Sequence, residues 1–387
     1  MRHISRFARG LPWVAILLLA AGCGHSEPFA GATQPPLDGP LVAATPLRLT
    51  YDDGMDHVAT FSPDGATLLY SAQPLLTHDR DRCIGLMPPG GGTRQAICRF
   101  DAVGSDTTDA FEHAALSSDG GLLYGAFTSR IGAILVDRGA LRLGTVAAPW
   151  PGRALLITPT TVAGLSFDHV GTIRWLSSGT FFVVVTDQTL IGNPSASGKF
   201  DTLTIGVGML RGDLTESGAV FTAIAGADSA NGFDFSAAKD SIYFTRQDDA
   251  TLYAMPIGGG ARRSVYTEAP QSVRRIVRDP VRVGARVAVI GQNFPARVND
   301  RLVWTTGLEP ASAITLVRPS DGTATILTSI GSTPPPSGQG AVAAFGALAA
   351  SPDGCRLIVE HRMLKSPTFT TDLYAYCLGV SGQCSCS

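Results

Sequence analysis

The sequence predicts an all-β protein with a single β-propeller of six four-stranded blades, with seven shorter blades as the alternative. The first observation behind this prediction is a short hairpin motif that recurs along the chain, because self-similar units mark repeat architectures. The second is the abundance of turn residues, since the chain holds 44 Gly and 25 Pro among 387 residues. The third is that only 16% of the residues are charged, fewer than a set of amphipathic surface helices would need.

The motif is clearest in three copies, which read FSPDG at 61–65, LSSDG at 116–120 and ASPDG at 350–354. In each copy Asp or Ser can accept hydrogen bonds from the amides of a tight turn, Gly can adopt a positive φ, and apolar residues follow. Each copy therefore predicts two strands joined by a turn. With weaker copies included, the six units start near residues 60, 115, 175, 234, 276 and 349.

A third strand and a second Gly-rich turn follow several copies, as from Cys83, Leu252 and Ile314, which gives the four strands of a propeller blade. Six units between residues 47 and 378 would hold roughly 55 residues each, where a blade needs about 40–45, so long loops are expected. The segment PLRLT at 46–50 has the pattern of a fourth strand. We expect it to pair beside 372–378 and to close the ring, which removes exposed sheet edges.

These repeats resemble the blades of TolB-type propellers, which carry the same Ser-Pro-Asp-Gly turn and a later strand that ends before a Gly-Gly turn. The resemblance covers about 47–378. It implies the fold but no single function, because such propellers serve as scaffolds for many activities. TolB has an additional N-terminal α/β domain, whereas only a short tether precedes the propeller here, so a TolB role proper is not expected. Prolyl-oligopeptidase relatives add an α/β-hydrolase domain, which this sequence lacks.

The N-terminus predicts export. Arg2, Arg6 and Arg9 precede an apolar run at 11–21 that ends in Gly22-Cys23, the pattern of a signal peptide and too short a run to span a bilayer. The stretch LAAGC resembles the bacterial lipobox, which implies that Cys23 is diacylated and becomes the mature N-terminus. An ordinary cleaved signal, with Cys23 incidental, is the alternative.

The sequence therefore divides into a signal peptide at 1–22, the lipidated Cys23 with a flexible tether at 23–46, the propeller at 47–380 and a Cys-containing tail at 381–387. The lipid would anchor the protein in the bacterial cell envelope. Gly24 follows the Cys in place of the Asp that retains lipoproteins in the inner membrane of enteric bacteria, which favours the outer membrane.

Six further cysteines form an even set in a chain bound for an oxidising compartment, where disulfides are expected. Cys83 and Cys98 lie equally far from the turn at Gly90-Gly91, and Cys355 and Cys377 lie equally far from a loop near Ser366. Each pair would face across a hairpin. Cys384 and Cys386 could pair with each other, pair with a partner or stay free; reduced thiols throughout are the alternative.

The charge balance and the motifs exclude several classes of function. The net charge is −2, from 30 basic and 32 acidic residues, so nucleic acid is not an expected partner. The sequence has no GxSxG, HExxH or GxxxxGK[ST] motif, and no GxGxxG within a βαβ unit, which argues against the common hydrolase and nucleotide chemistries.

Two acidic-His pairs, Asp56-His57 and Glu112-His113, precede the first strands of two units, a position that borders the central channel in propellers. Imidazole and carboxylate groups that converge there could bind a divalent metal, which could act as a Lewis acid or activate water. The alternative is that they are polar loop residues that hydrogen-bond between blades. A divalent metal is the only cofactor considered; otherwise none is expected.

Five arginines occur within thirteen residues and could form a basic stripe for an anionic lipid, lipopolysaccharide or cell-wall polymer. They are Arg274, Arg275, Arg278, Arg282 and Arg286. The alternative is that they form the solvated face of strands in a degenerate blade.

These observations favour a non-catalytic envelope lipoprotein, whose propeller binds a protein or a cell-wall ligand and which reaches the membrane through its N-terminal lipid. The first alternative is a metal-dependent propeller enzyme of the sugar lyase or lactonase type. The second is a structural component of envelope assembly.

Overall fold

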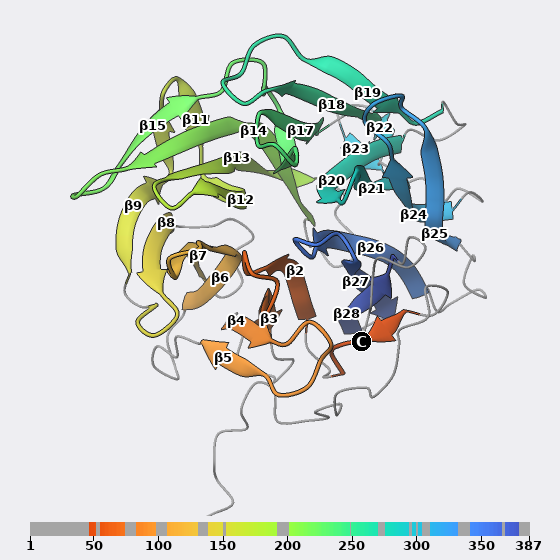
Figure 1. Ribbon diagram of the computed structural model, residues 1–387, viewed down its shortest axis with the longest axis horizontal. Helices are drawn as coiled ribbons and strands as arrows, with labels where there is room; N and C mark the ends of the chain where they lie inside the picture. The colour runs from red at the N-terminus through yellow and green to blue at the C-terminus, as the bar shows by residue number, and fades with distance from the viewer. Residues whose placement is uncertain are drawn as a thin grey trace, which may run out of the picture.

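Apolar residues alternate with polar ones around tight turns along the whole chain, and this pattern produces strands throughout the part of the chain that the structure describes. The computed structural model describes residues 46–51, 55–73, 83–97, 107–130, 138–149, 152–191, 201–247, 249–269, 275–293, 296–298, 301–303, 310–331, 341–365 and 368–378. Within these ranges no helix is both long and apolar enough to cross a membrane. Six four-stranded blades surround a common axis (Figure 1), the first and the last joined into one eight-stranded sheet, which confirms the predicted six-bladed β-propeller.

The blades follow one another along the chain. Blade 1 consists of β2 (Met55–Phe61), β3 (Leu68–Gln73), β4 (Cys83–Met87) and β5 (Gln95–Ile97). Blade 2 consists of β6 (Thr107–Leu116), β7 (Gly121–Arg130), β8 (Arg138–Thr145) and β9 (Arg153–Thr158). Blade 3 consists of β12 (His169–Ser177), β13 (Thr180–Ile191), β14 (Asp201–Leu214) and β15 (Ala219–Ala223).

The second half of the ring repeats this order. Blade 4 consists of β16 (Ala230–Phe235), β17 (Ser241–Arg246), β18 (Thr251–Pro256) and β19 (Arg263–Thr267). Blade 5 consists of β20 (Arg275–Val283), β21 (Arg286–Asn293), β24 (Pro310–Val317) and β25 (Ala324–Gly331). Blade 6 consists of β26 (Ala341–Ala350), β27 (Arg356–Lys365), β28 (Thr368–Cys377) and β1 (Leu47–Arg48).

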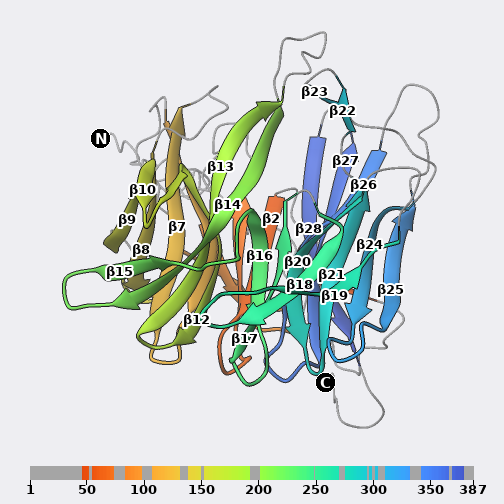
Figure 2. The ribbon, with the colours of Figure 1, turned by 90° about the horizontal axis from the view of Figure 1, so that it is seen from above.

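Two small hairpins are added to this ring. One, β10 (Thr160–Val162) with β11 (Leu165–Phe167), connects blade 2 to blade 3, and the other, β22 (Ala296–Val298) with β23 (Arg301–Val303), lies within blade 5. In blade 3 the strands β13 and β14 extend beyond the ends of the neighbouring strands (Figure 2).

The N-terminal strand closes the ring, as predicted. Leu47 pairs with Ala375 and Arg48 with Tyr374, so β1 becomes the fourth strand of blade 6. The Leu49 amide donates to the Leu373 carbonyl at 2.7 Å, and Arg48 Nη2 lies 2.7 Å from Asp372 Oδ2. Blades 6 and 1 also touch through a parallel pairing of Met55 with Thr371.

Apolar cores lie between the blades. Six clusters of buried side chains occur among the described residues, and each joins two adjacent blades, so that every one of the six interfaces has its own core. The cluster between blades 6 and 1, for example, contains Ile358, Leu373, Leu68 and Tyr70. Burial of apolar surface therefore stabilises every contact around the ring.

The recurring turn has the geometry that its residues predict. In blade 1 the Ser62 hydroxyl donates to Asp64 at 2.5 Å and accepts from the Thr67 amide at 2.9 Å. Ser117 with Asp119, and Ser351 with Asp353, repeat this contact in blades 2 and 6. The Gly that ends each turn has a positive φ, +73° at Gly65, +86° at Gly120 and +73° at Gly354.

Every innermost strand is interrupted by a β-bulge at an equivalent place. The register shifts lie between His57 and Thr60, Glu112 and Ala115, Val170 and Ile173, Ala230 and Gly232, Arg278 and Val281, and Phe345 and Leu348. A bulge bends its strand and redirects side chains. The six bulges together determine which side chains and carbonyls face the axis of the propeller.

The turn at Gly354 should be much less tolerant of a side chain than the same turn at Gly120. A Cβ at either position meets the positive φ, which costs about 1–2 kcal/mol. At Gly354 it would also lie 2.4 Å from the Gly284 nitrogen of blade 5, whereas at Gly120 no atom lies within 4 Å. We expect Gly354→Ala to lower the free energy of unfolding by about 1–3 kcal/mol more than Gly120→Ala, measured by urea denaturation. Equal losses would show that blades 5 and 6 do not make this contact.

Candidate active site

Charged side chains from three blades meet near the axis of the propeller. They are His57 on β2, Arg278 and Asp279 on β20, and Glu360 and Arg362 on β27, and we call them the axial cluster. β2 and β20 are innermost strands, and β27 pairs with the innermost strand β26 (Figure 1). Such groups are costly to bury unless they are paired.

Glu360 is the centre of this cluster. Its side chain is only 1% exposed, and its Oε1 lies 3.1 Å from His57 Nδ1 and accepts a hydrogen bond from Arg362 Nε at 2.6 Å. The contact with His57 joins blade 6 to blade 1. A carboxylate can only accept a hydrogen bond, so the Nδ1 of His57 carries the proton and Nε2 is the basic nitrogen.

The bulge of β26 provides the room for Glu360. A Cβ at Gly346 would lie 2.1 Å from Glu360 Oε1 and 2.6 Å from Arg362 Nε, closer than any real side chain could lie. Only glycine can therefore occupy this position beside the Glu360–Arg362 pair.

Arg278 and Asp279 form an ion pair in the bulge of β20. Asp279 has a φ of 50°, an uncommon conformation for a residue other than Gly that Asp tolerates better than most. Arg278 also donates to two carbonyls of the β26 bulge, to Phe345 at 2.6 Å and to Gly346. This guanidinium thus links blade 5 to blade 6.

The charges of the cluster shift one another's ionisation. Burial alone would raise the pKa of the Glu360 carboxyl, but Arg362 and His57 lower that pKa far below its usual value. For Arg362 burial opposes the charge, whereas Glu360 and Asp279 raise its pKa. For Asp279 burial dominates and raises the pKa although Arg278 opposes the shift. Glu360 and Arg362 are therefore both charged in the neutral range.

His361, between these two residues on β27, has a different environment because successive side chains of a strand point to opposite faces. Its ring stacks on Tyr374 with 4.0 Å between the centroids, and its Nε2 lies 3.1 Å from the Tyr376 hydroxyl. Burial lowers the pKa of His361 to about 4. His361 is thus a neutral packing residue at neutral pH.

The structure brings together only part of the predicted metal site. His57 joins the axial cluster, whereas Asp56 precedes it on the strand, so its side chain lies on the opposite face and is 1% exposed. His113 lies in the bulge of β6 with a φ of 52°, and the side chain of Glu112 lies outside the described residues. Within the described part of the chain no group of three or more His, Cys, Asp or Glu side chains could hold a metal ion. A metal bound by these four residues stays a prediction.

The arginines of the predicted basic stripe occupy different surroundings where they are described. Arg278 belongs to the axial cluster, whereas the Arg282 guanidinium donates to the Gly284 carbonyl at 3.3 Å near the β20–β21 turn. Arg286 begins β21. Arg274 and the side chain of Arg275 lie outside the described residues. Binding of an anionic envelope component by this stripe stays a prediction.

Three of the predicted disulfide cysteines are disulfide-bonded: Cys83, Cys355 and Cys377. Cys377 pairs in register with Arg356, and the Leu378 amide donates to the Cys355 carbonyl at 2.9 Å, so the ends of β27 and β28 lie side by side. The predicted connectivity stays a prediction, because Cys98, Cys384 and Cys386 lie outside the described residues, as does the predicted lipid-bearing Cys23.

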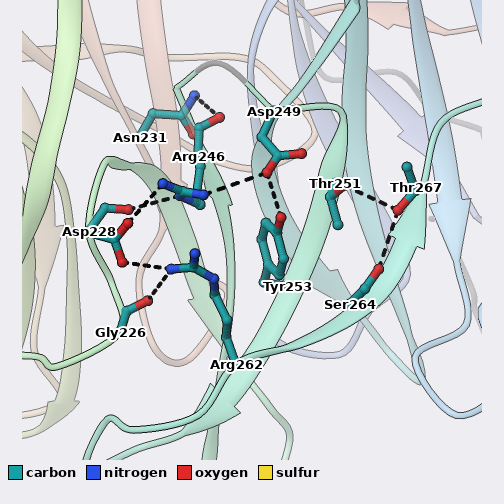
Figure 3. A network of polar contacts seen from close by, with 10 residues as sticks. All are labelled: Gly226, Asp228, Asn231, Arg246, Asp249, Thr251, Tyr253, Arg262, Ser264 and Thr267. Atoms are coloured by element: carbon teal, nitrogen blue, oxygen red, sulfur yellow. Dashed lines mark hydrogen bonds and ion pairs between the residues drawn. The ribbon is translucent and has the colours of Figure 1, made fainter. Parts of the chain in front are cut away.

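A second polar network lies in blade 4 (Figure 3). Asp228 binds Arg246 at 2.8 Å and Arg262 at 2.6 Å, and the Arg262 guanidinium lies over the Tyr253 ring, 5.3 Å from its centroid. Tyr253 in turn donates to Asp249. Arg262 also donates to the Gly226 carbonyl at 3.1 Å, so the network fastens the β15–β16 connection to blade 4. Its charged groups bind one another, which makes it an inter-blade contact.

Sequence reasoning did not single out Glu360, Arg362 or Asp279. A signal for the first two was present: Glu-His-Arg interrupts the apolar run LIVEHRML, which continues a clear copy of the repeat. Charged residues inside a strand that is expected to be buried indicate pairing with a charge elsewhere. The partner in this case, His57, lies 303 residues away.

No family model and no curated protein sequence matches the chain. Among solved structures, a gluconolactonase of Xanthomonas campestris has 15% identity and a TM-score of 0.49, over 88% of this chain and 91% of that one. The sialidase of Trypanosoma rangeli has 9% identity and a TM-score of 0.46, over 89% and 58%. Regucalcin of Agrobacterium tumefaciens, a calcium-binding protein, has 14% identity and a TM-score of 0.37, over 85% and 88%.

These comparisons stand against the predicted non-catalytic function, binding of a protein or a cell-wall ligand: two of the three similar proteins are named as enzymes, and the likeness itself shows the fold alone. The sequence-based argument against catalysis rested on missing motifs, and a charge cluster assembled from separate blades leaves no local motif.

The low pKa of His361 should make the fold sensitive to acid. An unfolded chain binds a proton at this residue below about pH 6.5, whereas the folded chain binds it only near pH 4. Stability is therefore unaffected by His361 above pH 6.5 and falls as the pH drops from 6.5 to 4, by at most about 3 kcal/mol. We expect His361→Gln to flatten this part of the stability profile, measured by urea denaturation at pH 7, 5.5 and 4. An unchanged slope would contradict the prediction.

Proposed function

We propose that the protein is an enzyme that hydrolyses a sugar lactone or a similar ester at the axial cluster, with His57 as general base. The observation that carries this proposal is the contact of His57 Nδ1 with the buried carboxylate of Glu360, whose Oε1 also accepts a hydrogen bond from Arg362 Nε. An imidazole oriented in this way by a carboxylate is a common arrangement for proton transfer.

The chemistry follows from the protonation state of this pair. His57 Nε2, which is buried within the axial cluster, accepts a proton from an enclosed water while the water oxygen attacks the lactone carbonyl. The ring C–O bond then breaks, and the imidazolium returns its proton to the departing alkoxide, so that lactone and water give a hydroxy acid. Glu360 does not react; as a positioning residue it fixes the tautomer of His57 and stabilises the imidazolium.

No step of this proposal passes through a metal ion. The Glu360 carboxylate already binds Arg362 and His57. A cation placed at this carboxylate would also be repelled by the Arg362 guanidinium.

Kinetics of two variants test the assignment on a six-membered sugar lactone such as gluconolactone. We expect His57→Ala to lower kcat/KM by about 100-fold or more, because the base is removed. Glu360→Gln keeps the shape but removes the charge that orients His57 and stabilises the imidazolium. It should therefore also lower kcat/KM, by less than His57→Ala.

Arg211→Gln on β14 is a matched control, because Arg211 forms an exposed ion pair with Asp213 at 2.9 Å within blade 3. It should retain wild-type rates. The proposal fails if the wild-type chain opens no lactone, or if His57→Ala is as active as the wild type while both remain folded.

We also propose that the protein is a TolB-type propeller lipoprotein, which is exported and anchored in the bacterial outer membrane by a lipid on Cys23. The support is the sequence pattern alone: three arginines, an apolar run and LAAGC. An anchored propeller would act on substrates in the envelope.

Labelled palmitate tests the anchor. The wild-type chain should incorporate the label and fractionate with membranes, whereas Cys23→Ala should lose the label and be released or left unprocessed. Cys384→Ala is the control for a cysteine outside the lipobox and should still be labelled. Labelling of Cys23→Ala would overturn the anchor.

A further inference from the structure

The two arginines of the axial cluster differ in how many of their donors the protein itself uses. Arg278 binds Asp279 and the carbonyls of Phe345 and Gly346. Arg362 binds only Glu360, and only through Nε. Within the described residues its two terminal nitrogens therefore have no hydrogen-bond or ion-pair partner, and the side chain is 36% exposed.

The position of Arg362 is fixed despite this exposure. Nε is held at 2.6 Å by a carboxylate that is itself 1% exposed and in contact with His57. Gly346 leaves the space in which this pair lies, since a Cβ there would reach Arg362 Nε at 2.6 Å. A guanidinium that is held by Nε presents its other edge, with two parallel N–H groups, in one orientation.

The geometry points to Arg362 as the binding residue for the carboxylate of an acidic sugar. Two parallel N–H donors match the two oxygens of a planar carboxylate, and such paired bonds are stronger than those between neutral groups. This inference rests on the proposed function, because the axial site is the same and Arg362 and His57 contact the same oxygen of Glu360. It adds that the preferred substrate carries a negative charge beyond its reacting ring.

The charges around Arg362 favour a ligand with a single anionic group over one with several. Arg278 is close enough to Arg362 for the two positive charges to interact, and an anion at Arg362 would relieve this repulsion. The Glu360 and Asp279 carboxylates limit the gain, because they also lie near the guanidinium. The site therefore suits a single carboxylate better than a densely charged polyanion.

Binding and turnover are measured separately, so that this inference and the proposed function can fail independently. Isothermal titration calorimetry compares glucuronate with glucose, which differ in a carboxylate at one carbon. We expect the wild-type chain to bind glucuronate about tenfold more tightly or better. Arg362→Gln should lose this difference, Arg362→Lys should keep part of it, and Arg211→Gln should keep all of it. Unchanged thermal unfolding of the variants shows that each is folded.

Turnover is then compared for gluconolactone and the lactone of glucaric acid, and we expect the charged lactone to have the higher kcat/KM by about tenfold. Glucuronate binding that depends on Arg362, without turnover of either lactone, would support this inference and overturn the proposed function. Turnover without preference for the charged lactone, together with equal binding of glucose and glucuronate, would support the proposed function and overturn this inference. Tighter binding of glucose phosphate or inorganic phosphate than of glucuronate would overturn the assignment of a carboxylate as the ligand. It would indicate a tetrahedral anion at Arg362 instead.

Discussion

The pairing of β1 with β28 is the contact on which the rest of the structure depends. Blade 6 takes three strands from the end of the chain and its fourth from Leu47–Arg48. Leu47 and Leu49 belong to the apolar core between blade 6 and blade 1, and a second core joins blade 6 to blade 5. The same closure brings His57 to Glu360, a contact between residues that are 303 positions apart. Fold and candidate site are thus consequences of one topological event.

The axial site arises from a feature that all six blades share. Each innermost strand has a bulge at the same place, but the residue in the bulge differs: His113 in blade 2, Asp279 in blade 5 and Gly346 in blade 6, for example. A bulge interrupts the ladder and leaves backbone groups that need other partners. Between blades 5 and 6 Arg278 supplies these partners, and the missing side chain of Gly346 admits Glu360 and Arg362. The same backbone bulge occurs in every blade, and a few side chains make the site between blades 5 and 6 different from the others.

Much of the fold could be predicted because its determinants are local. Ser117-Ser118-Asp119-Gly120 specifies its own turn, and the periodic return of this turn gives six blades. The site could not be predicted in the same way. His57 was recognised as a polar residue near the axis, but Glu360 was not, because nothing near Glu360 in the sequence shows that a His from blade 1 faces it. The bulges are equally hidden, since Arg278 and Val281 flank an ordinary Asp-Pro, and a shift by one residue there decides which side chains reach the axis.

The contrast between Arg278 and Arg362 shows how structural and functional charges can be separated within one cluster. Arg278 donates to the carbonyls of Phe345 and Gly346 in the β26 bulge, and a buried carbonyl without a donor would cost about 1–3 kcal/mol. That need accounts for this arginine without a ligand. No backbone group makes a similar demand on Arg362 among the described residues, and its only contact is a carboxylate that His57 also holds. Arg362 neutralises the buried Glu360 through Nε alone, which leaves its two terminal nitrogens in a fixed orientation and partly exposed, where a ligand can bind them.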